Sequence, residues 1–132
     1  MIMIEIETAG RVDVVDITDR VSQALRESGV KAGICLVYSL HTTTGLAINE
    51  ADGPLISDIL NLLERIAPVG AGYQHDRADG NAHAHLRAMI LGNSVMIPVE
   101  NGLLNLGTWQ RILFFELDGP RRRRIFVRFV PS

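Results

Sequence analysis

The sequence predicts a single α+β domain with a largely antiparallel sheet and a few helices, and three observations support this class. The chain has 132 residues, which is the usual size of one domain. Apolar residues make up 47% and charged residues 21% of it, a composition typical of globular rather than disordered proteins. Segments with a strand pattern outnumber helical segments and do not alternate with them regularly, which favours α+β over a doubly wound fold. We therefore treat 1–132 as one compact domain.

The first part of the chain contains two strands, a short helix and a longer strand. Residues 1–17 include two segments in which apolar and polar side chains alternate, as they do in half-buried strands. Thr18 or Asp19 can cap the helix that follows, and Gly29 ends it. The nearly continuous apolar run at 33–40 predicts a central strand that is covered on both faces.

A longer helix and several strands follow. Asp52 can cap this helix, Pro54 lies in its first turn, and Pro68 ends it. Its apolar positions recur at helical spacing: Leu55, Ile59, Leu62, Leu63 and Ile66. A second helix is predicted at 81–92, after a loop rich in glycine and charge. The other predicted strands are 45–49, 94–100, 110–117 and 123–130.

Bulk composition excludes several classes of protein. The net charge of −2 gives no overall field for nucleic acid or an anionic membrane. The lone Cys35 lies in an apolar run and cannot form an internal disulfide, which suits a reducing compartment. The N-terminus has no signal-peptide pattern, and no apolar run reaches the roughly 18 residues of a membrane helix. We expect a soluble cytoplasmic protein with neither a nucleic acid nor a membrane as its partner.

The "HAH" pair at 83–85 allows an argument about helix faces. Two residues apart on a helix, side chains diverge by about 200°, so one metal ion cannot easily bind both. The apolar positions that define the predicted inward face are Ala82, Leu86, Met89 and Ile90. His85 lies beside this face, whereas His83 lies with Arg87 on the other. We therefore expect His85 to be functional and His83 to be solvated.

Three histidines form a candidate metal site. Zinc and similar ions commonly use three neutral imidazoles and keep one position open for water or substrate. His41, His75 and His85 would supply such a set, and Asp76 and Asp79 could orient the His75 ring. The spacing follows no fixed signature, so the alternative is that each imidazole only bonds a backbone carbonyl. The expected cofactor is a divalent ion, zinc or magnesium.

Other polar residues near strand ends could contact a ligand. Thr42, Thr43 and Thr44 offer hydroxyl and backbone N–H groups to an anion, or are simply a threonine-rich strand edge. Glu50 could be a general base, or an acidic group that complements a helix N-terminus. Trp109 could stack on a flat ring, or belong to the core or a subunit contact.

The arginine run at 121–124 divides by strand alternation. Arg121 and Arg123 share a side with the buried apolar residues of the last strand. A buried guanidinium needs an anionic partner, which could be the phosphate or carboxylate of a ligand. The alternative is an ion pair with Glu116, with Asp118 or with another subunit.

Taken in order, several segments resemble the YjbQ-like family, which is named for secondary thiamine-phosphate synthase activity. They are "HTTTGLAINE", "YQHD", "DGNAHAHL", "GNSVMIPV", "NGLLNLGTWQRI" and "ELDGPRRRRI". The most specific part is "LGTWQ" followed by "DGPR". The resemblance extends from about Gly33 to the end of the chain, and the N-terminal 30 residues match only in general pattern.

The resemblance implies a compact α+β subunit that forms a homotrimer, with sheets packed around the threefold axis. It also implies a polar pocket near His41, His75 and His85, where a metal ion binds. The other family motif positions are Asn49, Glu50, Asp79, Asn81, Thr108, Gln110, Arg121 and Arg123. The family often has a smaller residue where Thr44 stands.

The activity that the resemblance implies joins a hydroxymethylpyrimidine diphosphate to a thiazole phosphate and releases pyrophosphate. We expect His41 and Glu50 to be catalytic. The expected contacts to the phosphorylated heterocycle are Thr42, Thr43, Asn49, Asn81, Thr108, Trp109, Gln110, Arg121 and Arg123. Two alternatives stay open: a non-enzymatic, metal-stabilised trimer that binds a small anion or a protein, and a metal-dependent hydrolase with Glu50 as base.

Overall fold

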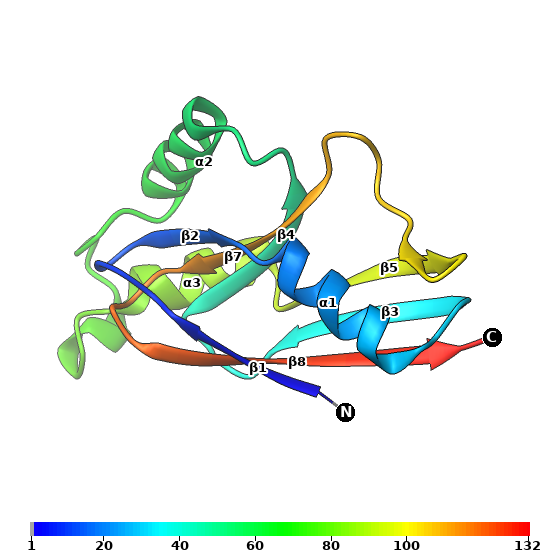
Figure 1. The fold of residues 1–132 in the computed structure, drawn as a ribbon. Helices are drawn as coiled ribbons and strands as arrows, with labels where there is room; N and C mark the ends of the chain where they lie inside the picture. The colour runs from blue at the N-terminus through cyan, green and yellow to red at the C-terminus, as the bar shows by residue number, and fades with distance from the viewer. Residues whose placement is uncertain (1) are drawn as a thin grey trace.

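The computed structural model describes residues 2–132 and contains two antiparallel sheets and three α-helices (Figure 1). The five-stranded sheet has the order β1 (Ile2–Glu7), β8 (Arg122–Pro131), β3 (Gly33–Ser39), β5 (Ser94–Glu100) and β6 (Leu103–Leu104). The three-stranded sheet has the order β2 (Asp13–Asp16), β7 (Arg111–Glu116) and β4 (Thr44–Asn49). The helices are α1 (Thr18–Ser28), α2 (Gly53–Ile66) and α3 (Ala82–Leu91), with a 3₁₀ turn η1 (Gln74–Arg77). The predicted α+β class with antiparallel pairing is confirmed.

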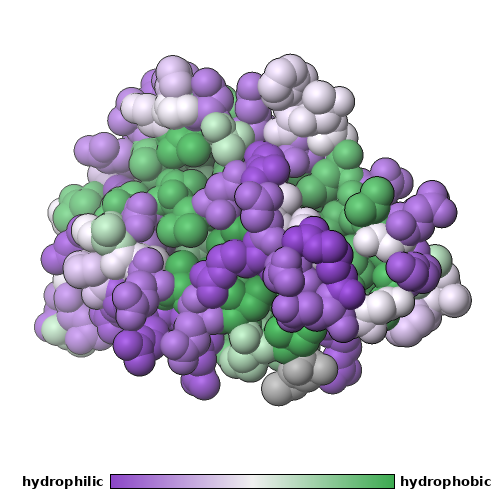
Figure 2. All heavy atoms as spheres, viewed as in Figure 1, coloured by the Kyte–Doolittle hydropathy of each residue, from purple (hydrophilic) through white to green (hydrophobic). Residues whose placement is uncertain are grey.

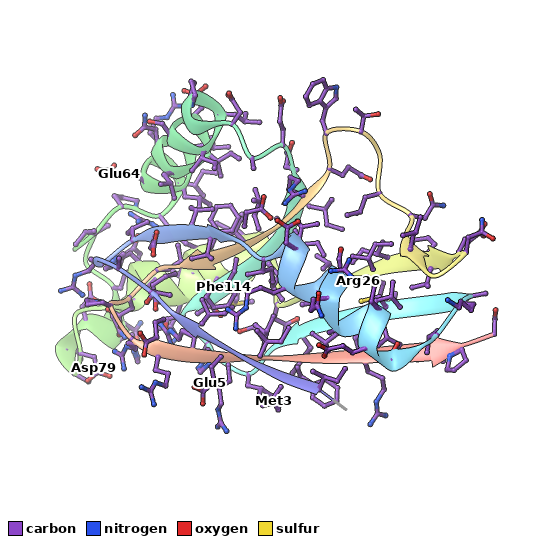
Figure 3. The ribbon with its side chains drawn as sticks, in the orientation of Figure 1. Met3, Glu5, Arg26, Glu64, Asp79 and Phe114 are labelled. Atoms are coloured by element: carbon purple, nitrogen blue, oxygen red, sulfur yellow. The ribbon has the colours of Figure 1, made fainter. Side chains whose placement is uncertain are left out.

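The core lies between the inner faces of the two sheets. Val37 and Ile125 of the larger sheet pack with Ile112 and Phe114 of β7, and all four are fully buried. Figure 3 shows Phe114 in the interior, whereas Met3 points outward from β1. On the other side of β7, Phe115 packs against α2 and α3. Strand β7 is therefore buried on both faces.

The central strand β3 differs from its prediction. It lies third of five in its sheet, as expected, and its Cys35 and Val37 are fully buried. Its other face is open, because Ile34 and Tyr38 are 45% and 38% exposed. We call this side the outer sheet face, which comprises Met3, Ile34, Leu36, Tyr38, Met96, Phe126 and Val130. The prediction that both faces of β3 are covered is wrong for the single chain.

The helix ends follow local chemistry. Asp52 caps α2 as predicted, because its carboxylate accepts the backbone N–H of Leu55 at 2.9 Å. Gly29 ends α1 in a left-handed conformation, also as predicted. The start of α1 differs, since Asp16 accepts the backbone N–H of Thr18 at 3.0 Å in place of a cap by Thr18 or Asp19. Along residues 2–132, no helix is long and apolar enough to cross a membrane.

Helix α3 faces the opposite way from its prediction. His83 and Arg87 are only 5% and 6% exposed, whereas Leu86 and Met89 are 40% and 82% exposed. The reason is that Ala84 and Ala88 form the contact with the sheet, since their small side chains allow close approach. The distribution of large apolar residues therefore does not predict which face of a helix is buried when alanines make the contact with the sheet.

Arg87 joins the two helices that cover β7. Its Nε donates to the carbonyl of Ala67 at 2.9 Å, at the C-terminal end of α2. A cation at this position complements the partial negative charge of the helix end. Helix α2 is otherwise loosely attached, because only Leu63 is buried while Leu62 and Ile66 are 48% and 56% exposed. Figure 2 shows apolar surface just below α2.

Candidate functional site

A pocket of about 460 Å³ lies where β3 ends and β4 begins. His41 and Thr42 come from the loop between these strands, Thr44 starts β4, and His85 and Met89 come from α3. The structure thus brings together two of the three predicted metal ligands. The threonine-rich loop forms one wall of this pocket, and α3 forms the other.

His41 is held at both its backbone and its ring. Its backbone N–H donates to Ser39 Oγ at 3.3 Å, and its Nε2 accepts the backbone N–H of Arg124 at 2.9 Å. Partial burial lowers the pKa of His41, and the positive charge of Arg123 lowers it further. The imidazole is therefore neutral at pH 7 with its proton on Nδ1.

His75 and His85 form the second part of the site. Their ring centroids lie 4.8 Å apart with the planes at 78°, which is an edge-to-face contact. His75 Nε2 lies 3.1 Å from Asn81 Oδ1 and 3.8 Å from Asp79 Oδ2. His85 therefore touches His75 and also lines the pocket that contains His41.

The imidazoles fit a divalent ion by chemical type, but they are not assembled around one point. Across residues 2–132, no three His, Cys, Asp or Glu side chains are grouped closely enough to hold a metal. The lone pair of His41 Nε2 is already engaged with Arg124. His75 and His85, with Asp79 nearby, are the most suitable starting pair for such an ion.

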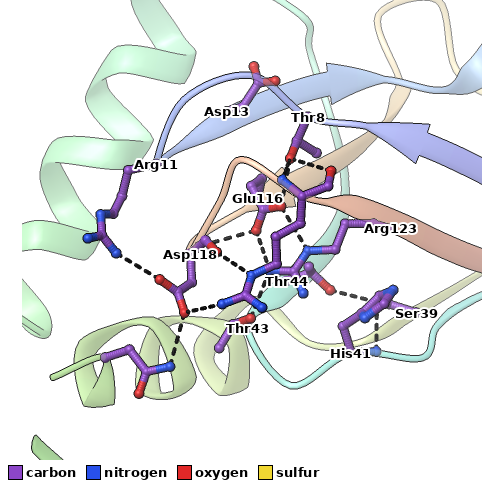
Figure 4. A network of polar contacts seen from close by, with 12 residues as sticks. Thr8, Arg11, Asp13, Ser39, His41, Thr43, Thr44, Glu116, Asp118 and Arg123 are labelled. Atoms are coloured by element: carbon purple, nitrogen blue, oxygen red, sulfur yellow. Dashed lines mark hydrogen bonds and ion pairs between the residues drawn. The ribbon is translucent and has the colours of Figure 1, made fainter. Parts of the chain in front are cut away.

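A buried ion pair bonds to the loop that forms one wall of the pocket (Figure 4). Arg123 Nε donates to Glu116 Oε1 at 2.8 Å, and Arg123 Nη2 donates to Glu116 Oε2 and, at 2.8 Å, to Thr43 Oγ1. Burial alone would raise the pKa of Glu116, but hydrogen bonds from Arg123 and Thr8 hold it below its usual value. Arg123 and Thr43, predicted to contact substrate, are instead buried and bonded to each other. The alternative partner for Arg123, Glu116, is the one that the structure shows.

A second buried carboxylate, Asp118, accepts hydrogen bonds from three side chains (Figure 4). Arg11 Nη1 donates to its Oδ1 at 2.8 Å, while Asn81 Nδ2 and Arg121 Nη2 donate to its Oδ2 at 3.0 and 3.2 Å. Burial works against ionisation, yet these contacts with Asn81, Arg121 and Arg11 lower the pKa of Asp118. Arg121 precedes β8, so strand alternation does not apply to it. The prediction that Arg121 points inward is wrong.

The other predicted site residues lie at the far end of β4. Glu50, Thr108 and Trp109 line a separate pocket of about 310 Å³, and Trp109 is 70% exposed. Asn49 ends β4, and its side chain accepts the backbone N–H of Glu50. Gln110 turns back to accept the N–H of Gly107 at 2.8 Å. Six strand residues, about 3.3 Å each, separate the two groups, so Glu50 and His41 do not meet within one chain.

Sequence reasoning missed one member of the polar network, Arg11, and gave two others only as alternatives. Arg11 lies between the first two strands and pairs with Asp118, which is 107 residues further along the sequence. A contact between residues so far apart in sequence cannot be predicted from local sequence patterns. Glu116 and Asp118 entered only as alternative partners for the arginines. The signal that could have identified them is their position directly before the "GPR" turn, among otherwise buried apolar residues.

These features define a class: a small α+β protein in which the β3–β4 connection and helix α3 place histidines and threonines around an open pocket. The family model "UPF0047 protein YjbQ-like" matches residues 2–132, and the chain belongs to this family. A UPF0047 protein of Archaeoglobus fulgidus is 54% identical over 123 residues, covering 93% of this chain and 95% of the relative. The UPF0047 protein YugU of Bacillus subtilis is 38% identical, covering 96% of each chain.

Solved structures agree with this family. A YbjQ-like protein of unknown function from Sulfolobus solfataricus P2 has a TM-score of 0.95 at 41% identity, covering 98% of this chain and 95% of that one. A hypothetical protein from Aeropyrum pernix K1 also has a TM-score of 0.95 at 41% identity, covering 98% and 97% of the two chains. The predicted family membership is confirmed.

Proposed function

We propose that the protein is a metal-binding homotrimeric enzyme of the cytoplasm that acts on a phosphorylated heterocycle. The proposed reaction is thiamine-phosphate synthesis, in which a hydroxymethylpyrimidine diphosphate is joined to a thiazole phosphate and pyrophosphate leaves. One observation supports the proposal above all others: the pocket between β4 and α3 contains His41 and His85, with His75 in contact with His85.

The chain supplies groups that suit such a reaction. His75 and His85 would hold a divalent ion, and Asp79 would orient the His75 ring. A bound divalent ion would neutralise charge on a departing diphosphate. His41, neutral at pH 7 and with its Nε2 lone pair engaged by Arg124, offers its Nδ1–H as a hydrogen-bond donor to a ligand. Thr42, which is exposed, offers a hydroxyl group on the same wall, whereas the Thr44 hydroxyl is bonded to Ser39 Oγ.

The outer sheet face supports the homotrimer. Ile34, Met96 and Val130 on this face are 45%, 68% and 51% exposed. Their strands pair directly, so these side chains form one continuous apolar surface. A contiguous apolar surface on a globular subunit is typical of a protein–protein contact. Packing this face against other copies would bury it around a threefold axis.

Assembly would also give the second residue group a role. Glu50 and Trp109 lie at the opposite end of β4 from His41 in the same chain. In a closed ring of subunits, one end of a subunit can face the other end of its neighbour. Glu50 and Trp109 of one copy would then complete the pocket of the next, with the indole available to stack on a flat ring.

The test is direct. Purified protein is incubated with the two phosphorylated precursors and a divalent ion, and thiamine phosphate is measured. We expect product from the wild type and none from His85→Ala, with both remaining trimeric.

Equal turnover by the two proteins would count strongly against the proposal. A metal-stabilised binding module, the main alternative, predicts that a chelator lowers the melting temperature while no product forms. Phosphoester hydrolysis without transfer would indicate the hydrolase alternative.

A further inference from the structure

We propose that Arg11 and Arg121, held in place by Asp118, form a binding site for a phosphate or diphosphate group beside the His75–His85 pair. The identification of the anion as part of an organic diphosphate rests on the proposed function. The site itself rests on the geometry around Asp118. Neither Arg11 nor Asp118 belongs to the set of residues that the sequence suggested as ligand contacts.

The geometry resembles a fork built on one buried carboxylate. Asp118 is 7% exposed, whereas the side chains of Arg11 and Arg121 are 68% and 56% exposed. Arg11 uses only Nη1 to reach Asp118, and Arg121 uses Nη2 and Nε to reach the side chain and backbone of Asp118. The other guanidinium N–H groups have no partner within residues 2–132. The Arg121 guanidinium is thus fixed along one edge and that of Arg11 through one nitrogen, which leaves the other donors of both available to a ligand.

The local charge favours an anion. Two guanidinium groups share the single negative charge of Asp118, so this cluster keeps one net positive charge. Of the neighbouring charges, Arg123 is paired with Glu116 and Arg122 with Glu7, whereas the Asp13 carboxylate accepts only the backbone N–H of Ala9. A hollow of about 520 Å³ beside Arg121 is lined also by Glu7, Thr8, Pro120 and Arg122, and Arg11 lies outside this lining. Guanidinium groups bind phosphate oxygens through two parallel hydrogen bonds, so prefixed arginines suit this ligand.

Asn81 connects this fork to the imidazoles. Its Nδ2 donates to Asp118 Oδ2 at 3.0 Å, and its Oδ1 lies 3.1 Å from His75 Nε2. One amide side chain therefore separates the arginine cluster from His75. The carboxylates of Asp76 and Asp79 lie on the His75 side, where they favour a cation. A diphosphate needs both a cation and donors for its outer oxygens, and the two kinds of group lie next to each other here.

The experiment measures binding of inorganic pyrophosphate to the purified full-length protein by calorimetry, with and without Mg²⁺. We expect the wild type to bind, and Arg11→Gln and Arg121→Gln each to weaken binding roughly tenfold to a hundredfold, as loss of a charge-assisted hydrogen bond predicts. Arg121→Lys should restore only part of the affinity, because it keeps the charge but not the fork. Arg128→Gln is the matched control, since Arg128 is an exposed arginine of β8 that rests over Phe126; it should bind normally.

Three results would overturn the inference: no pyrophosphate binding by the folded wild type, unchanged affinity in both arginine variants, or an equal loss in Arg128→Gln. Circular dichroism checks that each variant is folded. The outcome is separable from that of the proposed function. Arginine-dependent pyrophosphate binding without formation of thiamine phosphate would leave the anion site standing and remove the proposed reaction. Full turnover by Arg11→Gln and Arg121→Gln would support the proposed reaction and exclude the two arginines as its anion site.

Discussion

Arg123 and Glu116 form an ion pair inside the protein, with side chains 5% and 0% exposed. They join the ends of β7 and β8, which belong to different sheets. Arg123 also bonds the Thr43 hydroxyl, and the backbone carbonyl of Thr43 accepts the N–H of Leu117 at 3.1 Å. The pair therefore fixes the loop that forms one wall of the pocket.

Removing one partner of this pair should be far more harmful than replacing both. Arg123→Met leaves Glu116 charged and buried, which we expect to cost about 3–5 kcal/mol of unfolding free energy. The double variant Arg123→Met with Glu116→Leu removes both charges and should cost much less. Urea unfolding of the wild type, both single variants and the double variant measures this. Additive losses across the four proteins would contradict the argument.

Stability should fall at low pH through Glu116 and Asp118. Both have a lowered pKa in the folded protein, compared with about 4.3 and 3.9 in an unfolded chain. Their contribution is therefore complete above the unfolded values and is lost as pH falls through the folded ones. We expect the difference in melting temperature between the wild type and Glu116→Gln to be largest near pH 7 and to shrink below about pH 4. If the difference in melting temperature stays constant down to pH 3, ionisation of Glu116 does not cause the loss of stability at low pH.

The strands and helix positions could be predicted from sequence because each depends on neighbouring residues. The alternation in 123–130 and the caps at Asp52 and Gly29 are local signals, and the structure confirms them. The facing of α3 could not be predicted, because it depends on how closely Ala84 and Ala88 approach β7. The open face of β3 is a similar case, since apolar composition does not say whether the cover comes from the same chain.

The sequence predicted which types of residue occur near the site better than it predicted which of them lie close together. His41 and His85 do share a pocket, as the resemblance implied. The separation of Glu50 from His41 follows from the length of β4, which no motif encodes. The role of Arg123 could not be predicted, because it depends on a tertiary contact with a carboxylate of β7. Arg11 is likewise brought close to Asp118 only by the tertiary fold.

Gly33 should be the glycine whose replacement is most harmful. Its φ is +143°, and a Cβ there would lie 2.0 Å from the carbonyl oxygen of Val130. Gly33→Ala forces β3 away from β8, so we expect a loss of about 3 kcal/mol or more. Gly53→Ala is the matched control, because the same addition in the first turn of α2 meets nothing within 4 Å. It should be neutral or slightly stabilising. Equal melting temperatures for the two variants would contradict this reading of the strand contact.

Metal content should depend on the imidazoles that touch each other. We expect His85→Ala and His75→Ala to lose most of the zinc that the wild type retains after dialysis, measured by elemental analysis per chain. Asp79→Asn should weaken zinc binding roughly tenfold, as expected for a residue that orients a ligand. His83→Asn is the control, since His83 is buried on a different face of α3. Zinc retention that is equal in His85→Ala and His83→Asn would exclude the proposed ligands.

The outer sheet face should determine the oligomeric state. Met96 is 68% exposed and lies directly opposite Leu36 on the neighbouring strand, near the middle of this face. A glutamate there would carry a charge into any apolar contact between copies, and burial of an unpaired charge costs several kcal/mol. We expect Met96→Glu to convert a trimer into folded monomers, measured by light scattering after size-exclusion chromatography. Val69→Glu is the control, because Val69 is 64% exposed but lies beyond α2 and away from this face.

If Met96→Glu stays trimeric, or if the wild type is a monomer, the copies do not meet through the outer sheet face. If it becomes monomeric and also loses turnover while its own His41 pocket remains folded, the result supports the proposal that Glu50 and Trp109 of a neighbouring subunit complete the site.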